Sequence, residues 1–164
     1  MTQDRSPQDV AVVALPGRND TVGYYQSPLE VLLRGEVTGG KFLMTRQQGM
    51  PAELAPPFHV HTREDEIWIV DRGTFRFWLG GTSLDTAEVR DVGPGGVVYG
   101  PRDLPHTFQS LDGPGDVTIL WSPAQSQEYF LSVGDGDRRE DSEHAEALAR
   151  VGVFILDRAP VDGR

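Results

Sequence analysis

The sequence contains no cysteine. This absence excludes disulfide bonds, thiolate catalysis and zinc–thiolate sites. Lysine is nearly absent as well, so Schiff-base chemistry would depend on Lys41 or the N-terminus. The 15 basic residues are outnumbered by 25 acidic residues, which gives a net charge of −10 at pH 7. Because nucleic acids and anionic membranes both attract a basic surface, we expect neither as a partner.

Long hydrophobic runs are also lacking. The first apolar run is Val10–Leu15. A run of this length is shorter than the core of a signal peptide, about 7–15 residues, and far shorter than the about 20 residues of a membrane span. The sequence therefore predicts a cytoplasmic location.

Glycine and proline are plentiful, with 19 and 12 residues in a chain of 164. This length suits one domain. The glycines and prolines interrupt short apolar or alternating runs about every 8–12 residues, which is typical of an antiparallel sandwich or barrel. The expected strands are Leu29–Arg34, Lys41–Gln47, Phe58–Thr62, Glu66–Asp71, Thr74–Leu79, Glu88–Val92, Gly96–Tyr99, His106–Gln109 and Val117–Ser122.

The pattern divides the chain into an N-terminal arm over 1–22, a barrel over 23–123 and a helical tail over 124–164. Within the arm, Val10–Leu15 is apolar enough to form a further strand. Within the tail, Ser126–Leu131 and Ser142–Val151 have helical patterns. A charged, glycine-rich link over 134–141 joins them.

Three of the four histidines fall in two short stretches. His59 and His61 are two positions apart, so on a strand their side chains share a face and can bind one metal ion. Glu66 lies at an odd spacing from His61, so a turn over 62–65 must bring it back on the next strand. Two histidines and a carboxylate on one side of an ion leave positions open for substrate or dioxygen, which is typical of non-haem iron and related oxygen chemistry. His106 would hold the ion without closing the site.

Other acidic and histidine side chains near these positions have ordinary explanations. We expect Glu64 and Asp65 to face solvent or to pair with arginines. We expect His144, on the charged tail helix, to be exposed.

The same residues resemble the two sequence motifs of the cupin family. The first motif is matched by His59, His61, Glu66 and Gly73, and the second by Gly95, Pro101 and His106. Glu53 and Asp103 stand where the family has glycine, and Ser110 stands where it has asparagine. These departures concern loop geometry, whereas all four ligand positions are present.

Longer stretches are similar to single-domain cupins of the quercetin 2,3-dioxygenase-like group: Pro56–His61, Glu64–Trp68, Glu128–Phe130 and the final helix. The resemblance implies an all-β fold, the cupin double-stranded β-helix or jelly-roll barrel, with a short C-terminal helical extension that packs on the barrel. It implies one divalent metal ion held by His59, His61, Glu66 and His106. It also implies a homodimer.

A pocket follows from strand alternation. If Glu66 and His106 point inward, the residues that share their faces do too, and the expected pocket consists of Trp68, Val70, Phe108 and Ser110, with Met44 and Tyr129. Such an apolar, aromatic pocket suits a flat or hydrophobic organic molecule. Met44 and Arg46 share one phase of their strand, Leu43 and Thr45 the other, and the pattern does not choose between them. Tyr129 either closes the mouth of the barrel or anchors the tail.

Three functions are compatible with this site. The first is a dioxygenase that acts on a hydrophobic phenolic or enolisable small molecule, with Glu66 as the catalytic base. The second is a non-redox, metal-dependent cyclase or isomerase of a polyketide-like substrate, and the third is a small-molecule-binding cupin without turnover. We favour the dioxygenase because the longer stretches resemble the quercetin 2,3-dioxygenase-like group. The metal stays open, because iron, manganese, nickel, cobalt, copper and zinc all accept imidazole and carboxylate ligands.

Overall fold

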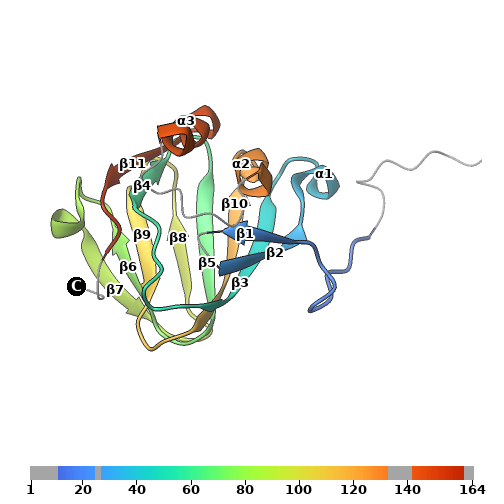
Figure 1. The fold of residues 1–164 in the computed structure, drawn as a ribbon, viewed down its shortest axis with the longest axis horizontal. Coiled ribbons are helices and arrows are strands. Elements are labelled where there is room, and N and C mark those ends of the chain that lie inside the picture. The colour runs from blue at the N-terminus through green and yellow to red at the C-terminus, as the bar shows by residue number, and fades with distance from the viewer. Residues whose placement is uncertain (1–10, 25–26, 133–141, 161–164) are drawn as a thin grey trace, which may run out of the picture.

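The computed structural model describes residues 11–24, 27–132 and 142–160. Its strands form two sheets that face each other across one apolar core (Figure 1). In spatial order, the six-stranded sheet contains β1 (Thr21–Tyr24), β2 (Ser27–Leu33), β3 (Leu43–Met50), β10 (Gly115–Ser122), β5 (Asp65–Arg72) and β8 (Val97–Gly100). The five-stranded sheet contains β11 (Val153–Asp157), β4 (Phe58–His61), β9 (His106–Ser110), β6 (Phe75–Leu79) and β7 (Glu88–Val92). The predicted all-β jelly-roll barrel is confirmed.

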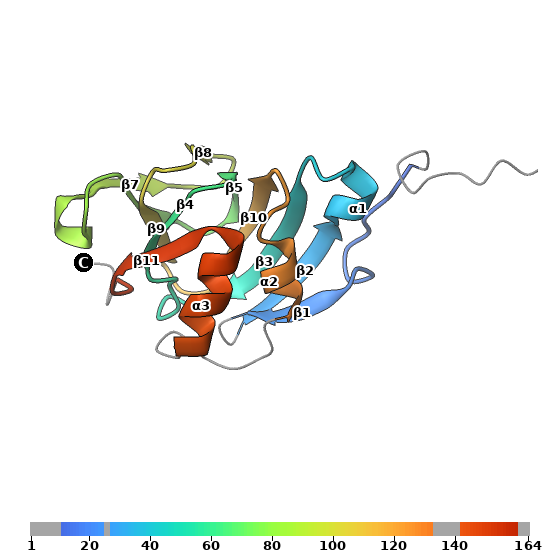
Figure 2. The same cartoon turned by 90° about the horizontal axis from the view of Figure 1, so that it is seen from above.

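Short helices complete the described chain. They are α1 (Gly35–Thr38), the 3-10 turn η2 (Leu84–Thr86), α2 (Gln127–Ser132) and α3 (Ser142–Val151). Figures 1 and 2 place α2 and α3 at the same end of the barrel. Among the described residues, no helix is both long and apolar enough to cross a membrane.

Each strand expected between Leu29 and Ser122 is present, with ends shifted by at most three residues. The expected strand over Val10–Leu15 is wrong for the part that the structure describes. Residues 11–15 form no strand, and Val13 is 75% exposed. An apolar run becomes a strand only where a neighbouring strand can accept its backbone hydrogen bonds. The first ten residues of the arm and the link over 134–141 lie outside the described residues.

The tail differs from its expected, purely helical form. Gly152, with φ of 87°, ends α3 in the left-handed conformation and turns the chain into β11. This strand pairs with β4, so that Val153 lies opposite His61 and Ile155 opposite His59. The tail therefore extends the sheet that carries His59, His61 and His106.

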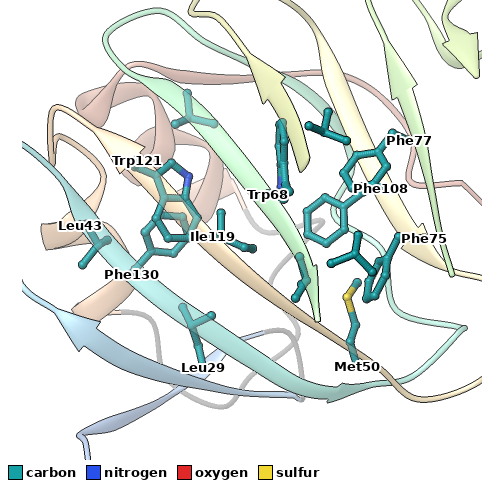
Figure 3. Packing of buried hydrophobic residues seen from close by; sticks show 14 of the residues in the cluster. Leu29, Leu43, Met50, Trp68, Phe75, Phe77, Phe108, Ile119, Trp121 and Phe130 are labelled. Carbon is teal, nitrogen blue, oxygen red and sulfur yellow. The ribbon is translucent and has the colours of Figure 1, made fainter. Parts of the chain in front are cut away.

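Aromatic side chains fill the barrel (Figure 3). Trp68 on β5 packs against Phe77 on β6 with 5.5 Å between ring centroids, and Phe108 on β9 stacks on Phe77 at 5.9 Å. The outer face of β6 is covered too. There Trp78, 2% exposed, packs with Phe58 and Leu84 in a second small cluster.

Gly115 lies at an irregularity in β10, where a side chain has no room. A Cβ there would lie 2.6 Å from the Phe75 ring and 2.7 Å from Ser110 Oγ. We predict that Gly115→Ala lowers the free energy of unfolding by about 1–3 kcal/mol, the usual cost of overpacking a core. Urea denaturation measures the change. Gly93→Ala is the matched control, because a Cβ at Gly93 meets no atom within 4 Å. Equal stability of the two variants would contradict the prediction.

The neighbouring Asp116 joins three strands through its carboxylate. It accepts hydrogen bonds from Arg72 Nε and Nη2 at 2.8 and 2.9 Å and from the Gly49 backbone N–H at 2.7 Å. The Arg72 guanidinium, helped by Gly49, holds the pKa of Asp116 below its ordinary value of 3.8. The ionised form is thus the stabilising one. Its contribution is complete above the ordinary pKa and is lost as the pH falls through the lowered pKa of the folded state.

We predict that Asp116→Asn lowers the free energy of unfolding by about 1–2 kcal/mol at pH 7, because charge-assisted hydrogen bonds are lost. The deficit should shrink as the pH falls below 3.8 and through the lowered pKa, because the wild-type carboxylate then becomes protonated as well. Denaturation curves across this pH range give the measurement. Asp91→Asn, which removes a carboxylate more exposed than that of Asp116 from its pair with Arg76, serves as the control. A deficit independent of pH would contradict the assignment.

Candidate metal centre

Four residues from both sheets converge inside the barrel. His59 and His61 come from β4 and His106 from the start of β9, where it lies directly opposite His59. Glu66 reaches the same point from β5 in the other sheet. One potential ligand atom from each of the four lies within 4.8 Å of every other. The turn expected over 62–65 is what carries Glu66 across to the facing sheet.

The potential ligand atoms are close to one another. His59 Nε2 lies 3.0 Å from His61 Nε2. Glu66 Oε2 lies 3.3 Å from His61 Nε2 and 3.1 Å from His106 Nε2. The site is also dry: His61, Glu66 and His106 are each at most 3% exposed.

The outward-facing nitrogens of the rings have fixed partners. His59 Nδ1 lies 2.7 Å from the Pro57 carbonyl oxygen, and His106 Nδ1 lies 2.9 Å from that of Leu104. Because a carbonyl oxygen can only accept, both Nδ1 atoms carry hydrogen, and the Nε2 lone pairs of the neutral rings face the centre. Lone pairs this close repel one another unless a proton or a cation lies between them. The residues present therefore fit a divalent metal ion.

The electrostatics of His59, His106 and Glu66 agree with this fit. For His61, the effect of burial is outweighed by the hydrogen bond to Glu64 together with the charges of Glu66 and Glu64, so its pKa is raised. Burial, together with the charge of His61, lowers the pKa of His106 to about 3, and burial also lowers the pKa of His59 well below its ordinary value. Both rings are thus neutral at pH 7, the form that a metal requires. Burial raises the pKa of Glu66, against the opposing effect of His61 and His59. A cation at the centre would offset the cost of the buried negative charge.

In the loop before His106, Asp103 stands where the cupin pattern has glycine, but the backbone keeps a conformation that suits glycine. Asp103 adopts φ of 65°, the left-handed conformation that glycine accepts most readily and aspartate more readily than most residues. Its backbone N–H donates to the His61 carbonyl oxygen at 2.7 Å. The substitution therefore preserves the loop that aligns the two ligand strands.

The expectation that Glu64 faces solvent or an arginine is wrong. Its side chain is fully buried and lies 2.7 Å from His61 Nδ1. The one feature of the sequence that could have predicted this contact is the short spacing between His61 and Glu64 across a tight turn. For Asp65 we expected either exposure to solvent or pairing with an arginine. It pairs with Arg102, with 3.0 Å between Arg102 Nε and Asp65 Oδ1.

The expectation that His144 is exposed is also wrong. His144 is 3% exposed, and its Nδ1 lies 3.0 Å from the Tyr129 hydroxyl. The physical reason is that α3 packs its inner face on α2. Tyr129 thereby lies in the contact between the two tail helices.

Two small cavities adjoin the histidines. Each has a volume of about 20 Å³, enough for roughly one water molecule. Both are lined by Tyr24, Pro56, His59, His61 and Phe130. The inner cavity adds Leu29, Glu66, Phe108, Ile119 and Trp121, and the outer one adds Pro57, Leu148, Val153 and Ile155.

The structure places the expected pocket residues unevenly. Phe108 lines the inner cavity, whereas Trp68 and Val70 are buried in the core beside it. Ser110 donates its hydroxyl to the Gly113 carbonyl oxygen at 2.6 Å. Tyr129 lines neither of the two cavities.

The phase of β3 corrects the assignment of Met44. Leu43 and Thr45 are completely buried and face the interior, so Met44 lies on the other face of the sheet. The sequence left these two phases open. Wall residues such as Tyr24 and Phe130 come from segments distant in sequence, which strand alternation around the motifs does not reach.

Comparison with known proteins agrees with the fold. The model of the cupin domain family matches residues 46–123. No curated protein matches the sequence.

Several solved structures share this fold at low identity. KdgF from Halomonas sp. is 18% identical with a TM-score of 0.60, covering 73% of this chain and 99% of that one. A single-residue variant of oxalate decarboxylase from Bacillus subtilis is 16% identical with a TM-score of 0.57; the match covers 75% of this chain and 33% of the decarboxylase. An RmlC-like cupin from Shewanella frigidimarina is 14% identical with a TM-score of 0.57, covering 73% and 96% of the two chains. The cupin domain model thus matches the central part of this chain, and the solved structures share its fold.

Proposed function

We propose that this protein is a metal-dependent cupin enzyme, a dioxygenase of the quercetin dioxygenase-like kind that acts on a hydrophobic phenolic or enolisable small molecule. The observation that carries the proposal is the convergence of His59, His61, Glu66 and His106 beside an apolar cavity. His59, His61 and His106 would hold the ion through Nε2 and Glu66 through Oε2. A redox-active divalent metal in this place supplies a centre at which a substrate oxygen and dioxygen react.

Glu66 is the group that we assign to proton transfer. Its raised pKa brings the carboxylate closer to the range of a general base at neutral pH. A substrate hydroxyl at the inner cavity would give its proton to the Glu66 carboxylate after this group has left the ion, which the three histidines would then hold. The neighbouring His61 favours the ionised form of Glu66, which keeps the carboxylate able to accept a proton.

The cavity walls determine what can reach this base. Phe108, Trp121 and Phe130 offer apolar and aromatic surface, which favours a flat, hydrophobic molecule over a sugar or a dicarboxylate. A volume of about 20 Å³ admits no such molecule without movement of the wall. Phe130 on α2 and Tyr24 on β1 are the wall residues on short peripheral elements, so we assign the required displacement to them.

A second candidate is a non-redox cyclase or isomerase. The observation that favours it is the same buried base, because proton transfer by Glu66 requires no oxidant. Here the ion acts only as a Lewis acid. The homodimer, the cytoplasmic location and the division of the chain into arm, barrel and tail stay predictions.

Metal content tests the ligand set first. We predict that His59→Ala abolishes stoichiometric binding of a divalent metal, because the remaining ligands no longer enclose the ion. Elemental analysis after exhaustive dialysis provides the measurement. His144→Asn is the control, since it removes another buried imidazole outside the cluster. Unchanged metal content in His59→Ala would show that the ligand assignment is wrong.

Oxygen uptake tests the reaction. We predict that iron-loaded protein consumes oxygen with at least one member of a panel of phenols and enolisable ketones. Glu66→Gln should slow this rate by about 10²–10⁴-fold, the usual contribution of a general base, while the three histidines retain the metal. An oxygen electrode measures the rate.

The same assay separates the candidate functions. Turnover by zinc-substituted protein without oxygen would favour the non-redox enzyme. Tight binding of a panel compound without any turnover, and surviving His106→Ala, would favour a binding protein.

A further inference from the structure

Glu64 is a buried carboxylate that the proposed reaction does not use. It lies in the turn between β4 and β5, and its side chain is completely inaccessible to solvent. A buried carboxylate is costly unless several donors compensate it. Glu64 has four such contacts: His61 Nδ1 at 2.7 Å, the backbone N–H groups of Gln125 and Ser126 at 3.1 and 3.0 Å, and the Ser126 hydroxyl.

The contact with His61 distinguishes this ring from the other two. His59 and His106 donate to neutral carbonyl oxygens, whereas His61 lies against a carboxylate. A carboxylate partner fixes the tautomer and orientation of an imidazole and makes its free nitrogen a stronger donor to a metal. Of the four potential ligands, Glu64 therefore contacts His61 directly.

The remaining contacts of Glu64 reach the tail. Gln125 and Ser126 directly precede α2, and the Ser126 carbonyl oxygen accepts the backbone N–H of Phe130. Phe130 lines both cavities beside the histidines, and its ring packs 4.6 Å from that of Trp121. One carboxylate thus contacts a candidate ligand on one side and the segment that carries the cavity wall on the other.

We propose that Glu64 is a positioning residue that orients His61 and couples metal binding to the attachment of α2 over the cavity. The inference rests on the proposed metal site. Coupling is reciprocal: an ion that fixes His61 strengthens the attachment of α2 through Glu64, and a firmly attached α2 strengthens the binding of the ion.

Cobalt(II) binding tests the first half of the proposal. We expect Glu64→Gln to weaken Co²⁺ binding by about 10–100-fold, the usual effect of losing such an outer partner, and to change the visible absorption spectrum of the bound ion. Asp65→Asn is the matched control, because it removes the same charge from the next residue, which pairs with Arg102 instead. Ser126→Ala is the structural control, since it removes a contact with the tail but leaves the pair with His61.

Both control variants should bind Co²⁺ within about threefold of wild type, with an unchanged spectrum. Wild-type affinity and spectrum in Glu64→Gln would overturn the proposal. Equal weakening in Glu64→Gln and Asp65→Asn would also overturn it, because the effect would then reflect the loss of a negative charge and not the contact with His61. If the wild-type protein binds no Co²⁺, the metal site itself fails and this inference fails with it.

Hydrogen exchange of the wild-type protein tests the coupling even if Glu64→Gln does not fold. We expect Co²⁺ to slow exchange of the Gln125 and Ser126 amides at least about fivefold. Amides of β7, at the far edge of the same sheet as β4, serve as the internal reference. Slowing that is equal in both places, or absent at Gln125 and Ser126 when Co²⁺ is bound, would overturn the coupling.

Discussion

The structure depends on one constraint: three imidazoles and a carboxylate are brought together inside the barrel, where His59 is partly exposed and the other three are buried. Burial alone disfavours the charged form of each group, as the lowered pKa of His106 and the raised pKa of Glu66 show. The surroundings reduce this cost by giving every ring a partner for its outer nitrogen: a backbone carbonyl oxygen for His59 and His106, and the Glu64 carboxylate for His61. What remains unsatisfied is the centre, where lone pairs converge. The barrel thus has the donor set and the dryness that a metal ion requires.

Much of this arrangement could be predicted from the sequence, because it depends on local rules. Period-two alternation places His59 and His61 on one face, and glycines and prolines mark the turns around them. The same rules account for the strands of the barrel. His59 and His106 lie opposite each other on paired strands that are distant in sequence. No local rule predicts that the two residues meet, but the motif resemblance does, because it implies that both hold one ion.

The features that the sequence did not predict depend on contacts between distant segments. Glu64 looks like one of three acidic residues in a charged turn, and only the arrival of Ser126 from the tail explains its burial. His144 lies on a charged helix, and only packing against Tyr129 removes it from solvent. The strand β11 follows from the turn at Gly152 and from the free edge of β4, neither of which is visible in a local pattern.

Because of these tail contacts, the barrel and the tail contribute different residues to the site. The barrel motifs supply the ligands, whereas the tail supplies β11 beside the histidine strand and Phe130 and Leu148 in the cavity wall. Changes in the tail can therefore alter which molecule fits without disturbing the ligands, which is how one fold comes to host many reactions. Glu64 is the exception to this division, because it contacts both parts. A change at Glu64 would therefore affect the ligand set and the cavity wall together.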